Sequence, residues 1–529
     1  MSGHLWRVVV AAVELAILTA LIVLPRVANH RDVFIAGNVY FTDADCYARM
    51  TRVRICLAHP GTIVRHHEFE NFPQGTTPHT TAPFDYLVVA LAFSLAPFTR
   101  HALDLAGAVV SPLLALMGGW FLWWWARKMK FRYRWPMLVI FAVSPILVHG
   151  TALGRPDHQS LLIALLTIAL CAEWSLLVAP SRGWSMVAGC AWGLSLWISL
   201  YEPLILLVLF LIASSIFARY PGTRLVGKTH RIGWWCFLLC LAAALVIERR
   251  IPSFLSLTRD PFVRNWTRGI GELHPVSLWD PIWFQWAGYL LALLPLLLWW
   301  QRRKYFAPTA EARPFVLFLG LLGTTLLLTM WQARWGYFLV ALFAILLPFL
   351  AEPFRARALV WTVFIVSLWP MARAWDTALW PGESEQAQCA DARIEWVSLR
   401  ELALSMRSPD RQPFLAPWWL SPALAYWSEQ PGVGGSSHES IAGIVESARF
   451  YASEDARTAL EIIENHKVHF VLAYDADRTA SSSGQILGRA LPEHAMCFGL
   501  DLAPAQSAGF LVPLARSPAG QLFRIGNNR

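Results

Sequence analysis

Long apolar runs separated by short polar segments make up most of the chain before residue 374. A helix needs about 20 apolar residues to cross the hydrocarbon core of a bilayer, with roughly 17 to 25 as the working range. The pattern therefore predicts a polytopic α-helical membrane protein with about eleven spanning helices, and about thirteen as the upper limit. The predicted spans are residues 8–25, 103–126, 136–151, 160–180, 184–200, 203–219, 232–248, 282–300, 314–331, 335–354 and 358–373.

Basic loops set the expected orientation of these spans. Lys and Arg cluster at residues 127–134, 219–231, 302–313 and 355–357. Such loops are retained in the cytoplasm, and all four fall there if the amino terminus is also cytoplasmic. The other long loops and the tail then lie on the outer face, so we expect a multi-pass membrane protein. An apolar stretch at 84–98 in the first outer loop is short for a span and is predicted to lie along the membrane surface.

The tail differs in character from the rest of the chain. Its periodicity predicts helices at 393–406 and 456–466, and its apolar run at 468–474 predicts a buried strand. We therefore expect two domains, a transmembrane domain over 1–373 and a C-terminal α/β domain on the outer face over 374–529. Cys389 and Cys497 lie in this tail, and the sequence leaves open whether they pair or stay free thiols.

Composition supports this division. The chain of 529 residues is 56% hydrophobic and 15% charged. These polar residues are too few to cover the surface of an ordinary cytosolic enzyme, and the apolar content is too high for a disordered chain. The net charge of +9 does not indicate a nucleic-acid partner, because the tail carries 12 basic and 18 acidic residues. The positive excess therefore belongs to the membrane part, as the cytoplasmic loops require.

Four polar positions from separate segments are gathered on the outer face by this topology. Asp45, in Asp-x-Asp after the first span, is either a cation ligand or part of a solvated turn. Asp157 and His158 share one short loop, where capping the next helix explains the aspartate but not the pair. Glu272 lies in a long loop flanked by Gly, and Arg334 is either a phosphate contact or an interfacial anchor. Together they could hold a metal ion and a diphosphate.

Two other acidic segments are given structural interpretations. The spacing of His66-His-Glu-Phe-Glu70 suits neither a structural zinc site nor a His-Glu-x-x-His helix, so we expect a solvated loop there. Glu202 lies near the same outer face as the four polar positions above. Closing a break between two helices is a simpler role for it than serving as an additional catalytic acid.

At these residues the sequence resembles the catalytic subunit of oligosaccharyltransferase in its bacterial and archaeal single-chain forms, a branch of the GT-C membrane glycosyltransferases. The resemblance runs nearly from end to end. Asp45 is similar to the family's first-loop aspartate, and Gly-Arg-Pro-Asp157-His158 to its second-loop motif. Ile-Gly-Glu272 resembles its mobile-loop motif, and Arg334 falls where the family places a diphosphate-contacting arginine.

The tail carries both a further likeness and a departure. Trp418 and Trp419 resemble the start of the family's Trp-Trp-Asp motif, which implies acceptor binding. Leu420 stands where the family has the aspartate that accepts a hydrogen bond from the acceptor's Ser or Thr, and leucine cannot accept one. Strict recognition of Asn-x-Ser/Thr is therefore not expected.

The resemblance implies a metal-dependent transferase that moves a glycan from a polyprenyl-diphosphate carrier to an acceptor, expected to be a protein or peptide. Asp45, Asp157 and Glu272 would be catalytic and, with His158, would hold Mg²⁺ or Mn²⁺; Arg334 would contact the diphosphate. We expect it to act as a single subunit in contact with membrane lipid. The alternatives are a GT-C transferase or ligase that modifies a lipid or surface polysaccharide, and a transporter or flippase. Transporters usually place their acids near the bilayer midplane and often show internal repeats, neither of which is evident here.

Overall fold

The computed structural model describes residues 3–217, 228–251, 260–300, 302, 312–502 and 509–526. The chain forms two compact units. The first unit comprises Met1–His30, Val109–Ile251 and Glu272–Gly382, and the second comprises Arg31–Ala108, Pro252–Gly271 and Glu383–Arg529. The basic loops predicted at 219–231 and 302–313, and the end of the span predicted at 203–219, lie largely outside the described residues. The division into domains 1–373 and 374–529 stays a prediction.

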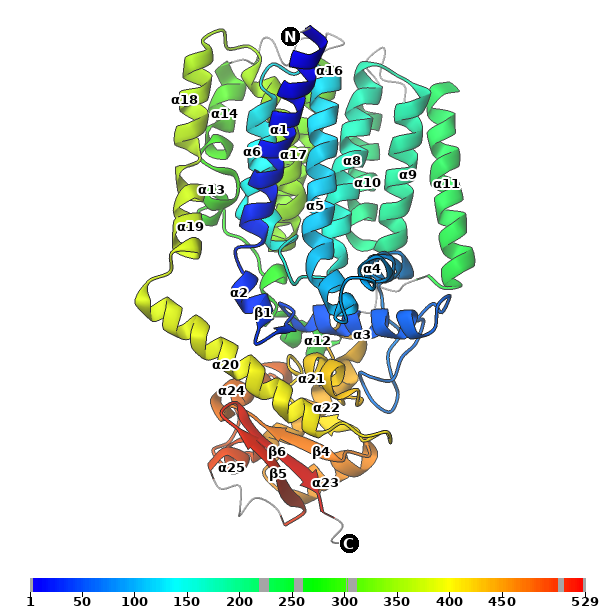
Figure 1. Ribbon diagram of the computed structural model, residues 1–529, viewed down its shortest axis with the longest axis vertical. Coiled ribbons are helices and arrows are strands. Elements are labelled where there is room, and N and C mark those ends of the chain that lie inside the picture. The colour runs from blue at the N-terminus through cyan, green and yellow to red at the C-terminus, as the bar shows by residue number, and fades with distance from the viewer. Residues whose placement is uncertain are drawn as a thin grey trace. The chain divides into compact units, whose positions relative to one another are not determined.

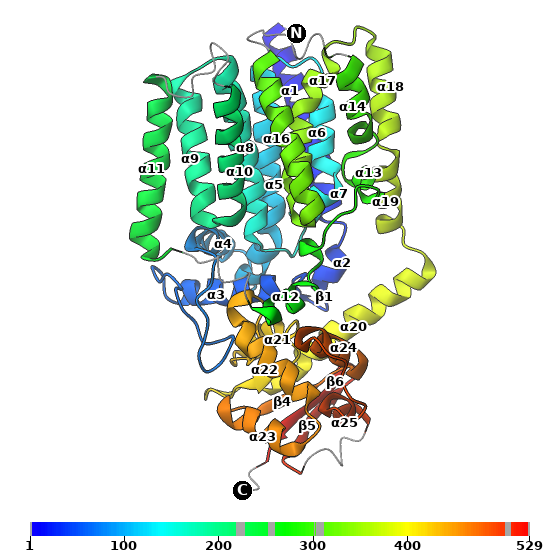
Figure 2. The same ribbon diagram turned by 180° about the vertical axis from the view of Figure 1, so that it is seen from behind.

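The first unit is built from helices, most of which run side by side (Figures 1 and 2). Every segment predicted to span the membrane contains helix. In chain order the helices are α1 (Gly3–Arg26), α5 (Ala102–Lys128, which begins in the second unit), α6 (Arg134–Val143), α7 (Pro145–His149), α8 (His158–Val178), α9 (Arg182–Ile198), α10 (Tyr201–Phe217), α11 (Lys228–Glu248), η2 (Gly271–Leu273, likewise shared), α13 (Ile282–Ala287), α14 (Leu290–Trp300), α16 (Ala312–Trp331), η3 (Ala333–Trp335), α17 (Gly336–Ala351), α18 (Arg357–Ser367) and α19 (Trp369–Leu379).

Three of the predicted spans are each broken into two helices. Ser144 takes an extended conformation between α6 and α7, as the residue before a proline is expected to do. Gly288 separates α13 from α14 with a φ of +70°, a conformation that glycine adopts without strain. The pair α18 and α19 is bent by 42°. Two of these breaks meet, since the backbone N–H of Tyr289 donates to the carbonyl of Ser367 at 2.9 Å.

Apolar composition identifies the chain as a membrane protein. Six helices among the described residues are long and apolar enough to cross a bilayer, or seven if α18 and α19 form one span. In α17, 83% of the apolar window is buried inside the protein, which makes it the central helix of the first unit. In α11 the corresponding share is 6%, so its apolar side chains remain for contact with lipid. The total of about eleven spans stays a prediction.

The second unit combines helices with a four-stranded sheet of order β3-β4-β6-β5 (Figure 1). Strand β3 pairs parallel with β4, and the other neighbours are antiparallel. Its elements are α2 (His30–Val33, which begins in the first unit), β1 (Phe34–Ile35), β2 (Asn38–Val39), α3 (Ala44–Ala58), α4 (Ala82–Leu95), α12 (Pro261–Thr267), α20 (Glu383–Ser405), β3 (Phe414–Leu415), α21 (Ser421–Ser428), η4 (His438–Ser440), α22 (Ile441–Ala452), α23 (Ala456–Asn465), β4 (Phe470–Ala473), α24 (Ala476–Leu487), α25 (Met496–Leu502), β5 (Leu511–Ser517) and β6 (Gly520–Ile525).

The local predictions for the tail agree with this structure. The helices predicted at 393–406 and 456–466 fall in α20 and α23, and the strand predicted at 468–474 contains β4. The helix predicted at 84–98 corresponds to α4. Cys389 is exposed and Cys497 is buried, and both are free thiols.

Glycines allow α9 and α11 to approach closely. A Cβ on Gly189 would lie 2.0 Å from the carbonyl oxygen of Gly233, and one on Gly233 would lie 2.4 Å from that of Ser185. Gly193, one turn after Gly189, faces Cys240 in the same way. Small residues at this spacing let two membrane helices pack backbone against backbone.

We expect Gly189→Ala to destabilise the protein by about 1–3 kcal/mol, because the added methyl group must separate two backbones. The matched control is Gly183→Ala on the same helix, where a Cβ meets nothing within 4 Å. Thermal unfolding in detergent measures both variants. Equal melting temperatures for the two would show that this contact is not tight.

Candidate active site

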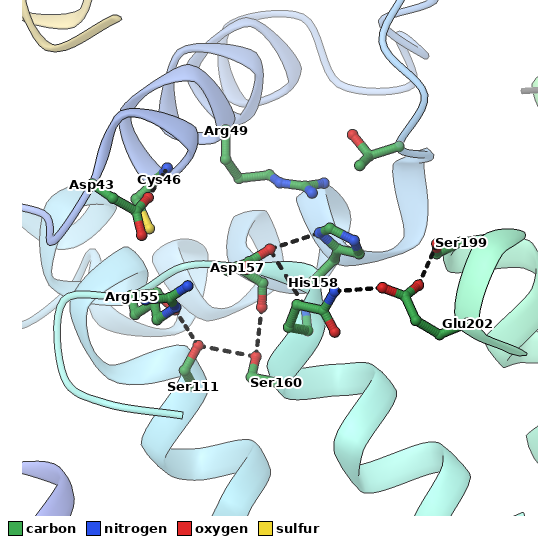
Figure 3. Close-up of polar contacts among 12 residues, drawn as sticks. Asp43, Cys46, Arg49, Ser111, Arg155, Asp157, His158, Ser160, Ser199 and Glu202 are labelled. Carbon is green, nitrogen blue, oxygen red and sulfur yellow. Dashed lines mark hydrogen bonds and ion pairs between the residues drawn. The ribbon is translucent and has the colours of Figure 1, made fainter. Parts of the chain in front are cut away.

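The loop before α8 presents Asp157 and His158 together. Gly154 has a φ of +74°, which lets the chain turn before the helix begins. Asp157 then caps α8 by accepting from the backbone N–H of Gln159 at 3.4 Å. Its Oδ1 also lies 2.6 Å from Nδ1 of His158 (Figure 3). The carboxylate therefore does more than end the helix, because it is paired with an imidazole.

Hydrogen bonds from α5 and α8 hold this loop in place. Ser160 donates through its hydroxyl to the carbonyl of Asp157 at 2.7 Å. Ser111 contacts the Ser160 hydroxyl at 3.0 Å and donates to the carbonyl of Arg155 (Figure 3). Both serines are buried, so the loop rests on a polar pair inside the helix bundle.

Glu202 is completely buried at the start of α10, and three groups converge on it. Gln159 donates through Nε2 to its Oε1 at 2.9 Å, and Ser199 donates to its Oε2 at 3.2 Å (Figure 3). Arg334 forms an ion pair with Oε1. The guanidinium also lies over the ring of Tyr201, 5.6 Å from its centroid. Glu202 thus fixes Arg334 relative to α8 and α10, a larger role than closing a helix break.

Glu272 belongs to a closed cycle of four side chains. Its Oε1 accepts from Arg155 at 2.5 Å and from the hydroxyl of Tyr337 at 3.1 Å. His149 completes the cycle, with Nε2 3.1 Å from Arg155 and Nδ1 3.0 Å from the Tyr337 hydroxyl. An arginine only donates, so Nε2 accepts and the proton lies on Nδ1, which donates to Tyr337. Tyr337 in turn donates to Glu272, and every member of the cycle has a consistent role.

These groups form one electrostatic cluster in the first unit. The charge of Arg334 interacts with Glu272 and Asp157 as well as with Glu202. Arg334 is thus electrostatically coupled to Asp157 and Glu272, which come from two other stretches of sequence, and Asp157 is paired with His158. The cluster holds two guanidinium groups that are each paired with a carboxylate, and the catalytic, metal-binding and diphosphate-binding roles of its members stay predictions.

Asp45 belongs to the second unit, in the first turn of α3. Asp43 is the N-cap of that helix and accepts from the backbone N–H of Cys46 at 2.9 Å. The two carboxylates of Asp-x-Asp therefore differ in role, since one caps the helix and Asp45 is exposed. Whether Asp45 joins Asp157 and Glu272 stays a prediction.

Comparisons with known proteins point to one fold. No protein-family model matches the chain, and no curated protein matches its sequence. The oligosaccharyltransferase of Archaeoglobus fulgidus in complex with Zn and sulfate is similar in structure, with a TM-score of 0.59, 14% identity and coverage of 97% of this chain and 73% of that one. The same enzyme tethered to an acceptor peptide containing the NVT sequon gives a TM-score of 0.61 at 13% identity, over 97% and 74% of the two chains.

A second glycosyltransferase matches over the full length of both chains. ArnT from Cupriavidus metallidurans, bound to undecaprenyl phosphate, gives a TM-score of 0.56 at 12% identity and covers 99% of this chain and 98% of its own. The chain has the GT-C membrane glycosyltransferase fold. The resemblance inferred from the sequence is thereby confirmed at the level of the fold.

The tail holds the residues predicted to bind the acceptor, near the start of α21. Trp418 donates through Nε1 to the hydroxyl of Ser482 at 3.1 Å and packs edge-on against Trp266. Trp419 packs against Tyr474. Leu420 is buried, with 3% of its surface exposed. Acceptor binding by the two tryptophans and the effect of Leu420 on acceptor choice stay predictions.

The predicted metal ligands of the first unit fit a divalent cation only in part. Asp157 and His158 offer an oxygen and a nitrogen side by side, which suits such an ion. Glu272 is occupied by Arg155 and joins a metal only after that ion pair opens. Among the described residues, the group of three ligand side chains with atoms within 4.8 Å of one another is a different one, His79, His438 and Glu439.

One interpretation of the sequence was wrong. The segment His66–Glu70 was expected to be a solvated loop, but His67 and Glu70 have only 6% and 2% of their surface exposed. Glu70 accepts from the backbone N–H of Ser436 at 2.7 Å, and the ring of His67 stacks on Phe69. A long-range hydrogen bond to the tail accompanies the burial of Glu70, and no local pattern indicates it, while His66 is exposed as expected.

Three residues of the site were not assigned by the sequence. Arg155 lies in the Gly-Arg-Pro-Asp-His motif, two residues before Asp157. A basic residue so close to a predicted catalytic acid was the signal that could have identified it. His149 and Tyr337 lie at the ends of apolar helices, where an interfacial polar residue is common and carries little information.

We expect Glu202→Gln to destabilise the protein by about 3 kcal/mol, because it leaves the charge of Arg334 without its partner. This value is near the lower end for a broken buried ion pair, since part of the Arg334 side chain is exposed to solvent. The control is Glu352→Gln, an exposed carboxylate in the same unit, which should change stability by less than about 0.5 kcal/mol. Thermal unfolding in detergent compares them. If the two variants unfold alike, Glu202 does not hold Arg334.

Proposed function

We propose that the chain is a glycosyltransferase that moves a glycan from a polyprenyl-diphosphate carrier to an acceptor, expected to be a protein, on the periplasmic face of a bacterial inner membrane. The observation that carries this proposal is the cluster of Arg155 and Arg334 with Asp157, Glu202 and Glu272 in a GT-C fold. The structural neighbours support it, since one is bound to undecaprenyl phosphate and another to an acceptor peptide.

The two guanidinium groups are the natural ligands for the phosphates of the donor. Arginine presents a planar fork of N–H groups that matches phosphate oxygens, and such contacts are shorter and stronger than neutral hydrogen bonds. Arg155 has 10% and Arg334 has 21% of its side chain exposed, so an entering anion can reach both. The donor phosphate would replace Glu272 as the partner of Arg155. Arg334 would remain held by Glu202 and would stabilise charge on the departing diphosphate.

After this exchange Glu272 would no longer pair with Arg155 and could contact the acceptor or a metal ion. Asp157 and Glu272 are the carboxylates of the first unit that would orient and deprotonate the acceptor, and His158 holds Asp157 in place from 2.6 Å. A bound Mg²⁺ or Mn²⁺, held by Asp157, His158 and the released Glu272, would supply Lewis-acid polarisation at this point. Asp45 remains the fourth member of the predicted catalytic set.

A second candidate is a GT-C transferase or ligase that modifies a lipid or surface polysaccharide. The structural match spans 98% of ArnT but 73% of the oligosaccharyltransferase, so the length of this chain is nearer to that of ArnT. Such an enzyme would use the same arginines for the donor phosphate.

We expect Asp157→Asn to lower glycan transfer by at least about 100-fold, the usual contribution of a positioned acid or base. Asparagine caps a helix as well as aspartate does, so the start of α8 is preserved while the charge is lost. Transfer is measured with full-length protein in detergent, a polyprenyl-diphosphate-linked glycan and an extract of acceptors. The control is Asp376→Asn, an exposed carboxylate on α19, which should transfer at the rate of the wild type.

Removal of metal belongs to the same assay. EDTA should abolish transfer, and Mg²⁺ or Mn²⁺ should restore it. Full transfer in EDTA would remove the metal from the proposal but leave the enzyme class intact. Glycan-carrier transport into liposomes that is unaffected by Asp157→Asn, with no transfer to any acceptor, would instead identify a flippase.

Acceptor choice should follow from the buried Leu420. Because leucine cannot accept a hydrogen bond from a Ser or Thr hydroxyl, a peptide with Asn-Val-Thr should be glycosylated no more than about three-fold faster than one with Asn-Val-Ala. A single lost hydrogen bond of about 1.5 kcal/mol would otherwise give a ratio above ten. Such a ratio would mean that another residue reads the hydroxyl.

A further inference from the structure

Two histidines and a glutamate far apart in the sequence meet in the second unit. His79 lies in the loop between α3 and α4, whereas His438 and Glu439 form the start of η4. Nδ1 of His79 is 2.6 Å from Oε1 of Glu439, and Nδ1 of His438 is 3.4 Å from Oε2 of the same carboxylate. The three residues each offer one ligand atom, and these atoms lie within 4.8 Å of one another.

The surrounding backbone builds this meeting point rigidly. The N–H of Gly432 donates to the carbonyl of Phe69 at 3.0 Å, and the N–H of Phe72 donates to the carbonyl of Gly432 at 3.2 Å. A Cβ on Gly435 would lie 2.4 Å from the hydroxyl of Ser440 and 2.9 Å from the Cβ of Glu70. The loop that carries His79 is therefore fixed against the segment that leads to His438.

Burial and charge prepare the site for a cation. Only 13% of each side chain of His438 and Glu439 is exposed, and 37% of that of His79. Oε2 of Glu439 is buried and has no hydrogen-bond partner among the described residues. Oε1 of this carboxylate faces Nδ1 of His79 and Oε2 faces Nδ1 of His438, so each oxygen is directed at an imidazole nitrogen.

The ligand types favour one metal class. Two imidazoles with one carboxylate is a set that Zn²⁺ accepts in tetrahedral sites, with a fourth position left for water. Mg²⁺ and Ca²⁺ prefer oxygen ligands and would find only one here. His79 and Glu439 share a proton in their short contact, and a bound metal ion would take the place of that proton. The ring centroids of His79 and His438 are 5.0 Å apart, so both imidazoles lie at the same place.

We infer that His79, His438 and Glu439 bind a Zn²⁺ ion that joins the loop after α3 to η4, directly before α22. None of the three residues is proposed for glycan transfer, and His79 interacts electrostatically with Asp45, the member of the predicted catalytic set that lies in the same unit. This inference goes beyond the proposed function and does not depend on it. The ion would stabilise the fold of the second unit whatever reaction the protein performs.

The experiment is zinc binding by the full-length protein in detergent. After metal is stripped, Zn²⁺ titration followed by calorimetry, together with elemental analysis, should give one tightly bound ion that depends on His438 and Glu439, counted apart from an ion held by Asp157 and His158. Glu439→Gln and His438→Ala should each lower the affinity by at least about 100-fold, since even partners that only orient a ligand cost 10- to 100-fold. Zn²⁺ should raise the melting temperature of the wild type but not of Glu439→Gln.

Two controls separate this site from other histidines. His101→Ala removes an exposed imidazole in the same unit and should bind Zn²⁺ as the wild type does. His158→Ala removes the imidazole of the candidate active site and should also retain the ion. Loss of zinc in His158→Ala with retention in His438→Ala would overturn the inference, as would unchanged affinity in Glu439→Gln.

Should both ligand variants fail to fold, X-ray absorption of the zinc-loaded wild type decides the question. The inference requires scattering from two imidazole rings around the metal. A shell of oxygen atoms alone, or no bound zinc at all, would mean that His79 and Glu439 form only a hydrogen-bonded pair. None of these measurements uses glycan transfer, so their failure leaves the proposed function untouched.

Discussion

The candidate active site depends on the pairing of charges that are removed from water. Arg334 is matched by Glu202, Arg155 by Glu272, and His158 by Asp157. An unpaired charge in such surroundings costs several kcal/mol, so each pair must either persist or be exchanged for another partner of the same sign. This constraint turns substrate binding into an exchange of partners, in which the phosphate of a donor takes the place of a carboxylate.

Exposure separates pairs that hold the fold from pairs that can exchange. In the second unit, Arg49 and Asp85 are 3.0 Å apart with 4% and 6% of their side chains exposed, and they join α3 to α4. Arg155 and Glu272 are as close, but 10% and 27% of these side chains are exposed. The side chain of Glu202 is 1% exposed, like those of the pair that holds the fold, whereas that of its partner Arg334 is 21% exposed, like those of the pair that can exchange. The site thus has a fixed carboxylate that positions an arginine and a second arginine that can change partners.

The sequence predicted what local chemistry determines and missed what distant contacts determine. Apolar runs located the α-helices of the first unit but not its short 3-10 turns, and the break at Ser144 follows from the proline after it. The predicted topology puts the loops of Asp157, Glu272 and Arg334 on one face, and the charge of Arg334 does interact with both carboxylates, while their roles stay predictions. The burial of Glu70 could not be predicted, since its partner at Ser436 is 366 residues away. The same holds for His79 and Glu439, which are 360 residues apart.

The exchange of partners is tested most directly by a cryo-electron microscopy structure of the full-length protein with a polyprenyl phosphate bound. The account predicts a phosphate in contact with both Arg155 and Arg334, with Glu272 released from Arg155 and Glu202 still paired with Arg334. A lipid phosphate bound elsewhere in the first unit, with both ion pairs as they are now, would contradict it.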